Sequence, residues 1–162
     1  MKIVSDTGPI IGLAKIGKLT LLEKCADEIL IPPMVYKELF GKIGPESEEI
    51  DKALNSFIKT VSLPQTEGQI RNAISGLDEG EKQAITLAYA RIDNVVLLID
   101  DRAGREVAEK LGIPITGLIG LILRLKEKGF VQNIGAIVEE LRRKGYWLSD
   151  DVVEMVKRLS GE

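Results

Sequence analysis

The sequence predicts a single α/β domain with a central, mostly parallel sheet of four to five strands, flanked by helices on both faces and followed by a helical C-terminal extension. Short apolar runs alternate with longer segments of helical periodicity, which is typical of a parallel sheet covered on both faces. The 162 residues fit one domain with a sizeable core. No repeat, low-complexity stretch or interdomain linker divides residues 1–162.

The first half of the chain contains three predicted strands, each closed by a breaker. Thr7-Gly8-Pro9 ends the first strand, and Pro9 suits the first turn of the helix that follows. Pro32-Pro33 ends the second strand and Pro64 the third. The predicted elements are strands at 3–4, 28–31 and 57–63, with helices over 10–16, 19–25, 33–40 and 46–55.

The second half contains the strongest strand, in which five consecutive apolar residues run from Val95 to Ile99. Apolar residues have helical spacing before and after this strand. Gly112 separates the helix that follows the strand from a further short strand. The predicted elements are helices over 66–75 and 78–92, strands at 95–99 and 113–116, and helices over 102–111, 118–128, 134–144 and 149–160.

Composition excludes several kinds of chemistry. The chain has no histidine, which removes Ser-His triads, a histidine general base and imidazole metal sites. The net charge of −3 produces no global basic field. One cysteine, no signal-peptide pattern and no apolar stretch long enough for a bilayer predict a cytoplasmic protein. Many Glu, Lys, Arg and Ile residues with few Asn and Gln resemble the composition of a thermophile's protein.

Acidic residues occur where strands or helices end or begin, at Asp6, Glu38, Glu81 and the pair Asp100-Asp101. Open α/β sheets bind ligands at the carboxyl ends of their strands. Carboxylates without histidine or cysteine suit a hard cation, so the pattern predicts a site for Mg²⁺ or Mn²⁺.

Each acid also has a structural alternative. Asp6 fits the N-cap of the next helix, and Asp78 with Glu81 three residues later matches a capping box. Glu38 fits a solvated helix position. One aspartate of the pair fits a cap for the helix from Arg102, but two exceed what a cap needs. We therefore expect Asp101 to face the site, with Asp100 beside it as a supporting group or additional ligand.

The order and spacing of these motifs resemble the PIN-domain nucleases, and more closely a PIN-like branch of VapC-type toxins. The resemblance spans essentially the whole chain. It rests on five segments: Ser5-Asp6-Thr7-Gly8-Pro9, residues 31–38, residues 77–85, residues 97–105, and the close of the chain from 117–120 through 145–149.

The resemblance implies a PIN-like domain that hydrolyses RNA phosphodiester bonds with a metal-activated water. By motif position it places catalytic acids at Asp6, Glu38, Glu81 and Asp101. A set of four residues is expected to bind the metal: Asp6, Asp101, Glu81 and Asp100. Substrate contacts are expected from Ser5, Thr7, Arg102 and Arg105. The resemblance also implies a homodimer and an antitoxin protein that blocks the site.

The chain departs from the family pattern in two places. Many members have a small hydroxyl residue two positions before the last acid, where this chain has Ile99. Thr116 and Gly117 stand where a further acid sometimes follows the last strand. These departures leave open a catalytically silent PIN-like binding module. A phosphorylation-dependent receiver-like switch is another alternative, because an acidic pair also ends a strand in receivers.

Overall fold

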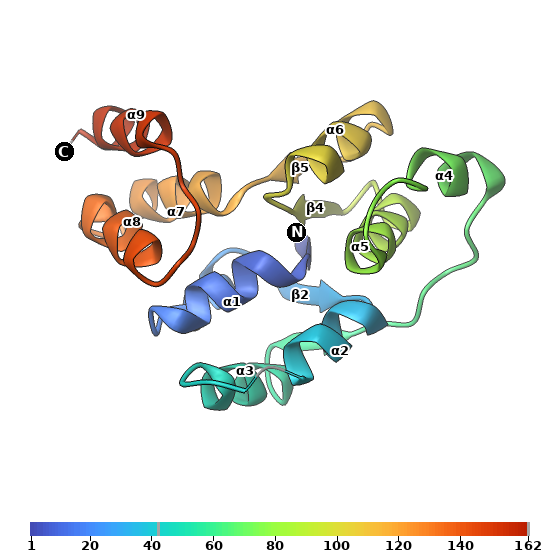
Figure 1. Ribbon diagram of the computed structural model, residues 1–162, viewed down its shortest axis with the longest axis horizontal. Helices are drawn as coiled ribbons and strands as arrows, with labels where there is room; N and C mark the ends of the chain where they lie inside the picture. The colour runs from blue at the N-terminus through green and yellow to red at the C-terminus, as the bar shows by residue number, and fades with distance from the viewer. Residues whose placement is uncertain (42, 162) are drawn as a thin grey trace.

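Five parallel strands form one sheet in the order β3-β2-β1-β4-β5. Figure 1 shows the helices that surround this sheet. The computed structural model describes residues 1–41 and 43–161. The strands are β1 (Lys2–Ser5), β2 (Glu28–Ile31), β3 (Ile58–Thr60), β4 (Val95–Leu98) and β5 (Ile115–Thr116). This architecture confirms the predicted α/β fold class, with helices on both faces of the sheet.

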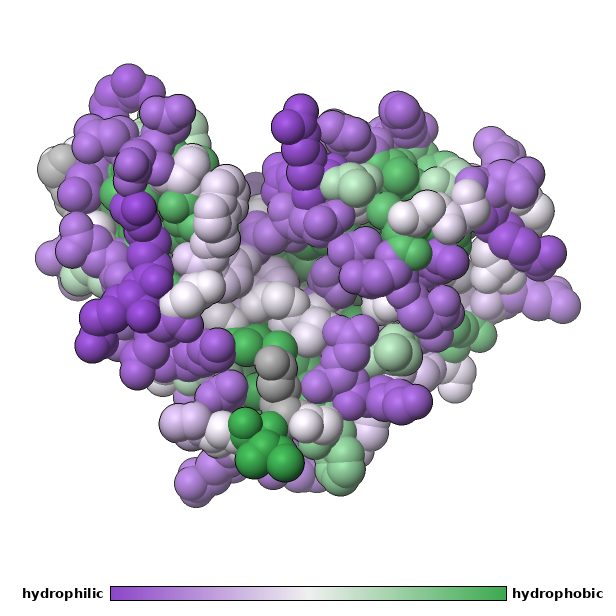
Figure 2. Space-filling model, in the orientation of Figure 1, coloured by the Kyte–Doolittle hydropathy of each residue, from purple (hydrophilic) through white to green (hydrophobic). Residues whose placement is uncertain are grey.

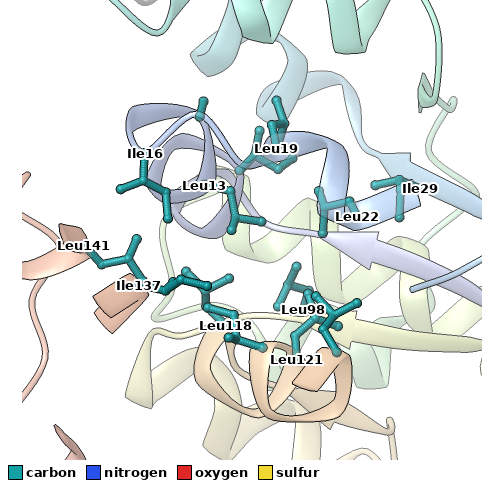
Figure 3. Close-up of a cluster of buried hydrophobic side chains, with 14 of the residues drawn as sticks. Leu13, Ile16, Leu19, Leu22, Ile29, Leu98, Leu118, Leu121, Ile137 and Leu141 are labelled. Carbon is teal, nitrogen blue, oxygen red and sulfur yellow. The ribbon is translucent and has the colours of Figure 1, made fainter. Parts of the chain in front are cut away.

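One face of the sheet is covered by the N-terminal helices and by the three C-terminal helices. Alternation along the strands directs Ile3 of β1 and Leu98 of β4 into this layer, where they meet leucines and isoleucines from the helices (Figure 3). The covering elements are α1 (Thr7–Lys15), the 3₁₀ helix η1 (Leu19–Lys24), α2 (Pro33–Phe40), α3 (Ser47–Leu54), α7 (Leu118–Glu127), α8 (Ile134–Arg143) and α9 (Asp150–Ser160).

The opposite face packs against a smaller group of helices, α4 (Gly68–Ala73), α5 (Glu79–Ala90) and α6 (Arg102–Lys110). Val4, Leu30 and Leu97 occupy matching register positions on this face. Ala84 and Ala88 of α5 are fully buried, and their small side chains allow the helix to lie close to the strands. The two apolar layers together enclose the sheet.

The predicted C-terminal extension is integrated into the core of the domain. Helices α7, α8 and α9 contact one another, and α8 also contacts α1 (Figure 1). Leu118, Ile122 and Leu141 are fully buried in the same cluster as Ile3. No helix among residues 1–41 and 43–161 is long and apolar enough to cross a membrane.

Several elements differ from the sequence prediction in length or type, and the helix predicted over 66–75 contains only Gly68–Ala73. The segment predicted as a helix over 19–25 is a 3₁₀ helix, and the strand predicted over 57–63 contains only Ile58–Thr60. The strand predicted over 113–116 is shortened to Ile115–Thr116. Pro114 has no N–H to donate, although its carbonyl accepts from Leu97 N at 2.8 Å.

Because Ile3 is fully buried in the central strand, Ile3→Ala should lower the free energy of unfolding by about 2–5 kcal/mol. The same substitution at Ile43, which is 97% exposed, is the matched control and should have little effect. Chemical denaturation monitored by circular dichroism measures both. Equal effects of the two substitutions would contradict this description of the core.

Candidate active site

Parallel pairing of β1 with β4 brings Asp6 beside Asp100 and Asp101. Ser5 lies opposite Leu98, and Asp6 N donates to the Leu98 carbonyl at 3.0 Å. The chain therefore leaves both strands at the same carboxyl edge of the sheet. Ser5 itself is fully buried, and its Oγ donates to the Asp6 carbonyl at 2.8 Å. It therefore supports the Asp6 backbone and has no exposed surface.

Glu38 of α2 is held toward Asp6 by two neighbouring elements. Thr7 Oγ1, at the start of α1, donates to Glu38 Oε2 at 2.7 Å. A Cβ added to Gly80 would lie 2.6 Å from Glu38 Oε1, so only glycine admits the carboxylate this close to α5. Gln83 Oε1 also accepts from Met34 N at 2.8 Å, which connects α5 to the first turn of α2.

Glu81 occupies the capping box that the sequence offered as its structural alternative. Its backbone N donates to Asp78 Oδ1 at 2.9 Å, and its Oε2 accepts from Asp78 N at the long distance of 3.4 Å. Glu81 is nevertheless only 9% exposed and lies close enough to Asp6 and Asp101 for their charges to affect it. Glu81 therefore caps α5 and also lies among the neighbouring acids.

Burial and the charges of neighbouring acids raise the pKa values of Asp6 and Glu81. Burial raises the pKa of Asp6 to about 6, with further contributions from the charges of Asp78, Glu38 and Asp101 against a lowering by the Thr7 backbone N–H. Burial likewise raises the pKa of Glu81 to about 7, reinforced by Asp78, Asp101 and Asp6. Like charges and desolvation both disfavour the ionised carboxylate. These five carboxylates form one electrostatic group, called here the acidic cluster.

The two adjacent aspartates have different environments. Asp101 caps α6, its Oδ2 accepting from Gly104 N at 2.9 Å, while its charge acts on Asp6 and Glu81. Asp100 instead accepts from Leu118 N at 3.0 Å and from the Tyr146 hydroxyl. Burial raises the pKa of Asp100, and the Leu118 N–H and the positive charge of Arg105 lower it.

Of the other residues predicted to contact substrate, Thr7 is buried and supports another side chain, whereas the two arginines are exposed or half-buried. Thr7 is 9% exposed and holds Glu38. Arg102 is exposed and its Nε pairs with Glu106 Oε1 at 3.2 Å, one helical turn away. Arg105 is half-buried, and its Nη1 donates to the Ile99 carbonyl at 3.2 Å. Both arginines line the depression that contains Asp100 and Asp101.

The sequence alone assigns no site role to two residues of this region. It predicts Asp78 only as a cap, although Asp78 lies one helical turn before Glu81 and places a second charge near the same point. Tyr146 lies 46 residues after Asp100, and its hydroxyl donates to that carboxylate. The capping motif is the sequence signal that could have placed Asp78 near the site. No local sequence pattern indicates that Tyr146 contacts Asp100.

The carboxylate oxygens of the acidic cluster are the kind of ligand that a hard divalent cation prefers. Within residues 1–41 and 43–161, no group of three or more His, Cys, Asp or Glu side chains is arranged to hold a metal ion. Mg²⁺ retains several waters and is held by one or two protein carboxylates together with substrate phosphates, so a closed protein cage is unnecessary. The acidic cluster supplies carboxylate oxygens of the type that such a cation prefers, among them those of Asp6 and Asp101.

Comparison with known proteins places the chain in a family. The family model described as "DUF3368: PIN domain" matches residues 2–162, so the chain belongs to the PIN domain family. PIN domains are typically nucleases that act on RNA and use divalent metal ions. This family assignment argues against the receiver-like alternative.

A solved structure supports the same fold. The chain is similar to a PilT N-terminus domain protein from the hyperthermophilic archaeon Sulfolobus solfataricus, at 18% sequence identity and a TM-score of 0.50. The alignment covers 92% of this chain and 98% of the archaeal one. No curated protein matches the chain.

The raised pKa of Asp6 predicts a pH-dependent gain in stability for Asp6→Asn. A carboxyl group with a raised folded-state pKa favours folding below its unfolded pKa of 3.8 and loses that contribution as pH rises through about 6. Without metal, the variant should be more stable than the wild type by on the order of 1–2 kcal/mol near neutral pH, with little difference near pH ~4. Thermal unfolding in EDTA across this range measures the difference.

Asp93→Asn provides the matched control, because Asp93 is exposed at the opposite, amino end of β4. Asp93→Asn should have nearly the same free energy of unfolding as the wild type at both pH values. A destabilised Asp6→Asn near neutral pH would contradict the electrostatic description of the acidic cluster.

Proposed function

We propose that this PIN domain is a metal-dependent endoribonuclease that hydrolyses RNA phosphodiester bonds, and that it is the toxin of a VapC-type toxin–antitoxin pair. The observation that carries the proposal is the acidic cluster, in which Asp6 and Glu81 have pKa values of about 6 and 7 at the carboxyl edge of a parallel sheet. Carboxylates that destabilise one another in the ionised state are retained at functional sites.

The side chains have distinct roles in this proposal. Asp6 and Asp101, with Glu81, would hold Mg²⁺ or Mn²⁺. When bound, the cation would supply a more easily deprotonated water as nucleophile and neutralise charge on the phosphodiester oxygens. Glu38, fixed by Thr7, is available to accept and orient a proton of the attacking water. Asp78 contributes further negative charge and holds the first turn of α5 through the Glu81 N–H.

Asp100 has a supporting role in the proposal. Its two oxygens accept from Leu118 N and Tyr146, which leaves Asp101 as the aspartate of the pair that faces Asp6. Arg102 and Arg105 line the same depression as Asp100 and Asp101 and would attract the phosphates of the substrate. Ser5 and Thr7 act by holding Asp6 and Glu38.

The partners in the proposal are an RNA substrate, a second copy of the chain and an antitoxin protein, all in the cytoplasm. The resemblance of the motif order to VapC-type toxins supports this assignment. The composition rich in Glu, Lys and Ile supports a thermophilic source.

A second candidate is a catalytically silent PIN-like binding module. Two observations favour it: Glu81 is engaged in a capping box, and Thr116 and Gly117 stand where a further acid would follow β5. In this alternative the acidic cluster would remain without a metal, and RNA would bind without being cleaved.

Asp101→Asn should abolish Mg²⁺-dependent cleavage of RNA, with a loss of at least about 100-fold, because an uncharged amide replaces a carboxylate expected to bind the cation. Asp6→Asn should have the same effect. Gel analysis of a purified RNA incubated with each variant measures cleavage. Asp93→Asn is again the control and should cleave as the wild type does. Undiminished cleavage by both site variants would refute the nuclease assignment at this cluster.

The wild type should bind Mn²⁺ in an isothermal titration at neutral pH, and Asp6→Asn should bind it at least about tenfold more weakly, since metal affinity depends on the charged ligands. Binding should also release protons, because the raised pKa values leave a fraction of Asp6 and Glu81 protonated near neutrality. Titration in two buffers of different ionisation enthalpy measures that release. Absence of Mn²⁺ binding by the wild type would favour the silent binding module.

A further inference from the structure

A groove of about 750 Å³ begins at the acidic cluster and runs between α6 and the C-terminal helices. Its lining includes Asp101, Gly8, Arg102, Arg105 and Trp147. Figure 2 shows the surface hollowed between the C-terminal helices and the rest of the domain. Side chains from α7 and α9 make much of its wall apolar.

Trp147 is the only tryptophan of the chain and is 83% exposed. Exposing so large an aromatic ring forgoes the stabilisation that burial would provide. The neighbouring Tyr146 is held on both sides: a Cβ added to Gly12 would lie 2.8 Å from its ring, and its hydroxyl donates to Asp100. The backbone that carries Trp147 is therefore anchored to α1 and to the end of β4.

Positive side chains line the groove and a depression that adjoins it. Arg102 and Arg105 lie within the groove. A second depression of about 210 Å³ shares Gly8 and Tyr146 with it and is lined by Lys15 and Lys144. Within the described part of the chain, neither lysine has an ion-pair partner within 4.0 Å. The two adjoining depressions therefore carry four cationic side chains together with the carboxylates of Asp100 and Asp101.

We propose that Trp147 is a base-stacking residue for single-stranded RNA bound along this groove. The strand's phosphates lie near Arg102 and Arg105, an unstacked base lies on the indole ring, and the chain continues past Gly8 toward Lys15. This inference rests on the proposed function, because it identifies how the substrate of that site is held. It assigns Trp147 a positioning role outside the acidic cluster.

The occupant follows from the combination of surfaces. Grooves that bind single strands combine cations that follow the backbone with aromatic faces on which bases stack. An A-form duplex would present its bases paired and stacked, so Trp147 would find no free base face. The apolar wall alone would also accept a helix or a second copy of the chain, but the cations that line both adjoining depressions match a polyanion that extends from one depression into the other.

The test uses the fluorescence of the single tryptophan. Wild-type protein in EDTA is titrated with a short single-stranded RNA and with an abasic strand of equal length and phosphate number. Both strands meet the same electrostatic environment, so their difference reports stacking. The base-containing strand should quench Trp147 fluorescence and bind about ten- to hundredfold more tightly than the abasic strand.

Variants separate stacking from folding. Trp147→Ala should reduce RNA affinity to that of the abasic strand and leave abasic binding unchanged, whereas Trp147→Phe should retain most of the affinity. Phe130→Ala is the matched control, because Phe130 is a half-exposed aromatic in a different depression, beside α8. Anisotropy of a labelled strand measures affinity for variants that lack tryptophan.

Equal binding of the two strands, or unchanged RNA affinity in Trp147→Ala, overturns the inference. A concentration-dependent blue shift of Trp147 emission without RNA also overturns it, because a second copy would then occupy the groove. The two proposals fail separately. If RNA binds and quenches Trp147 but is not cleaved with Mg²⁺, the stacking site is retained and the nuclease proposal fails. If RNA is cleaved and Trp147→Ala does not affect cleavage, the nuclease proposal is retained and the stacking site fails.

Discussion

In β1 and β4 the chain runs in the same direction, Ser5 lies opposite Leu98, and Asp6 N donates to the Leu98 carbonyl. This pairing, between the first strand and one that begins about ninety residues later, makes two carboxyl ends coincide. Asp6 and Asp101 therefore meet although they are remote in sequence. A slip of one residue would reverse which side chains face each apolar layer, so core packing also holds the register of the site.

The same edge concentrates negative charge that the fold must tolerate. Asp6 and Glu81 are buried among like charges, which raises their pKa values and lowers stability when they ionise. Supporting groups hold the carboxylates in place: Thr7 binds Glu38, and Gly80 allows that carboxylate to approach α5. Retaining such a cluster at a cost in stability is typical of functional sites.

The C-terminal helices connect the core to this edge. Asp100 accepts from the first N–H of α7 and from Tyr146, which lies between α8 and α9. One residue thus joins the end of β4 to two parts of the helical region, while its neighbour Asp101 caps α6. The groove that includes Asp101 is lined by residues of α6 and of these C-terminal helices.

The sequence by itself determined the fold class, the order of the elements and the acids at their ends, because periodicity and breakers are local signals. It also contained the capping box of Asp78 and Glu81 and the stop at Pro32-Pro33. Only the tertiary structure decided that β3 and β5 are short, that Asp78 belongs to the acidic cluster, and that Tyr146 binds Asp100. Those outcomes depend on contacts between segments far apart in the chain, and no local pattern encodes the distance between them.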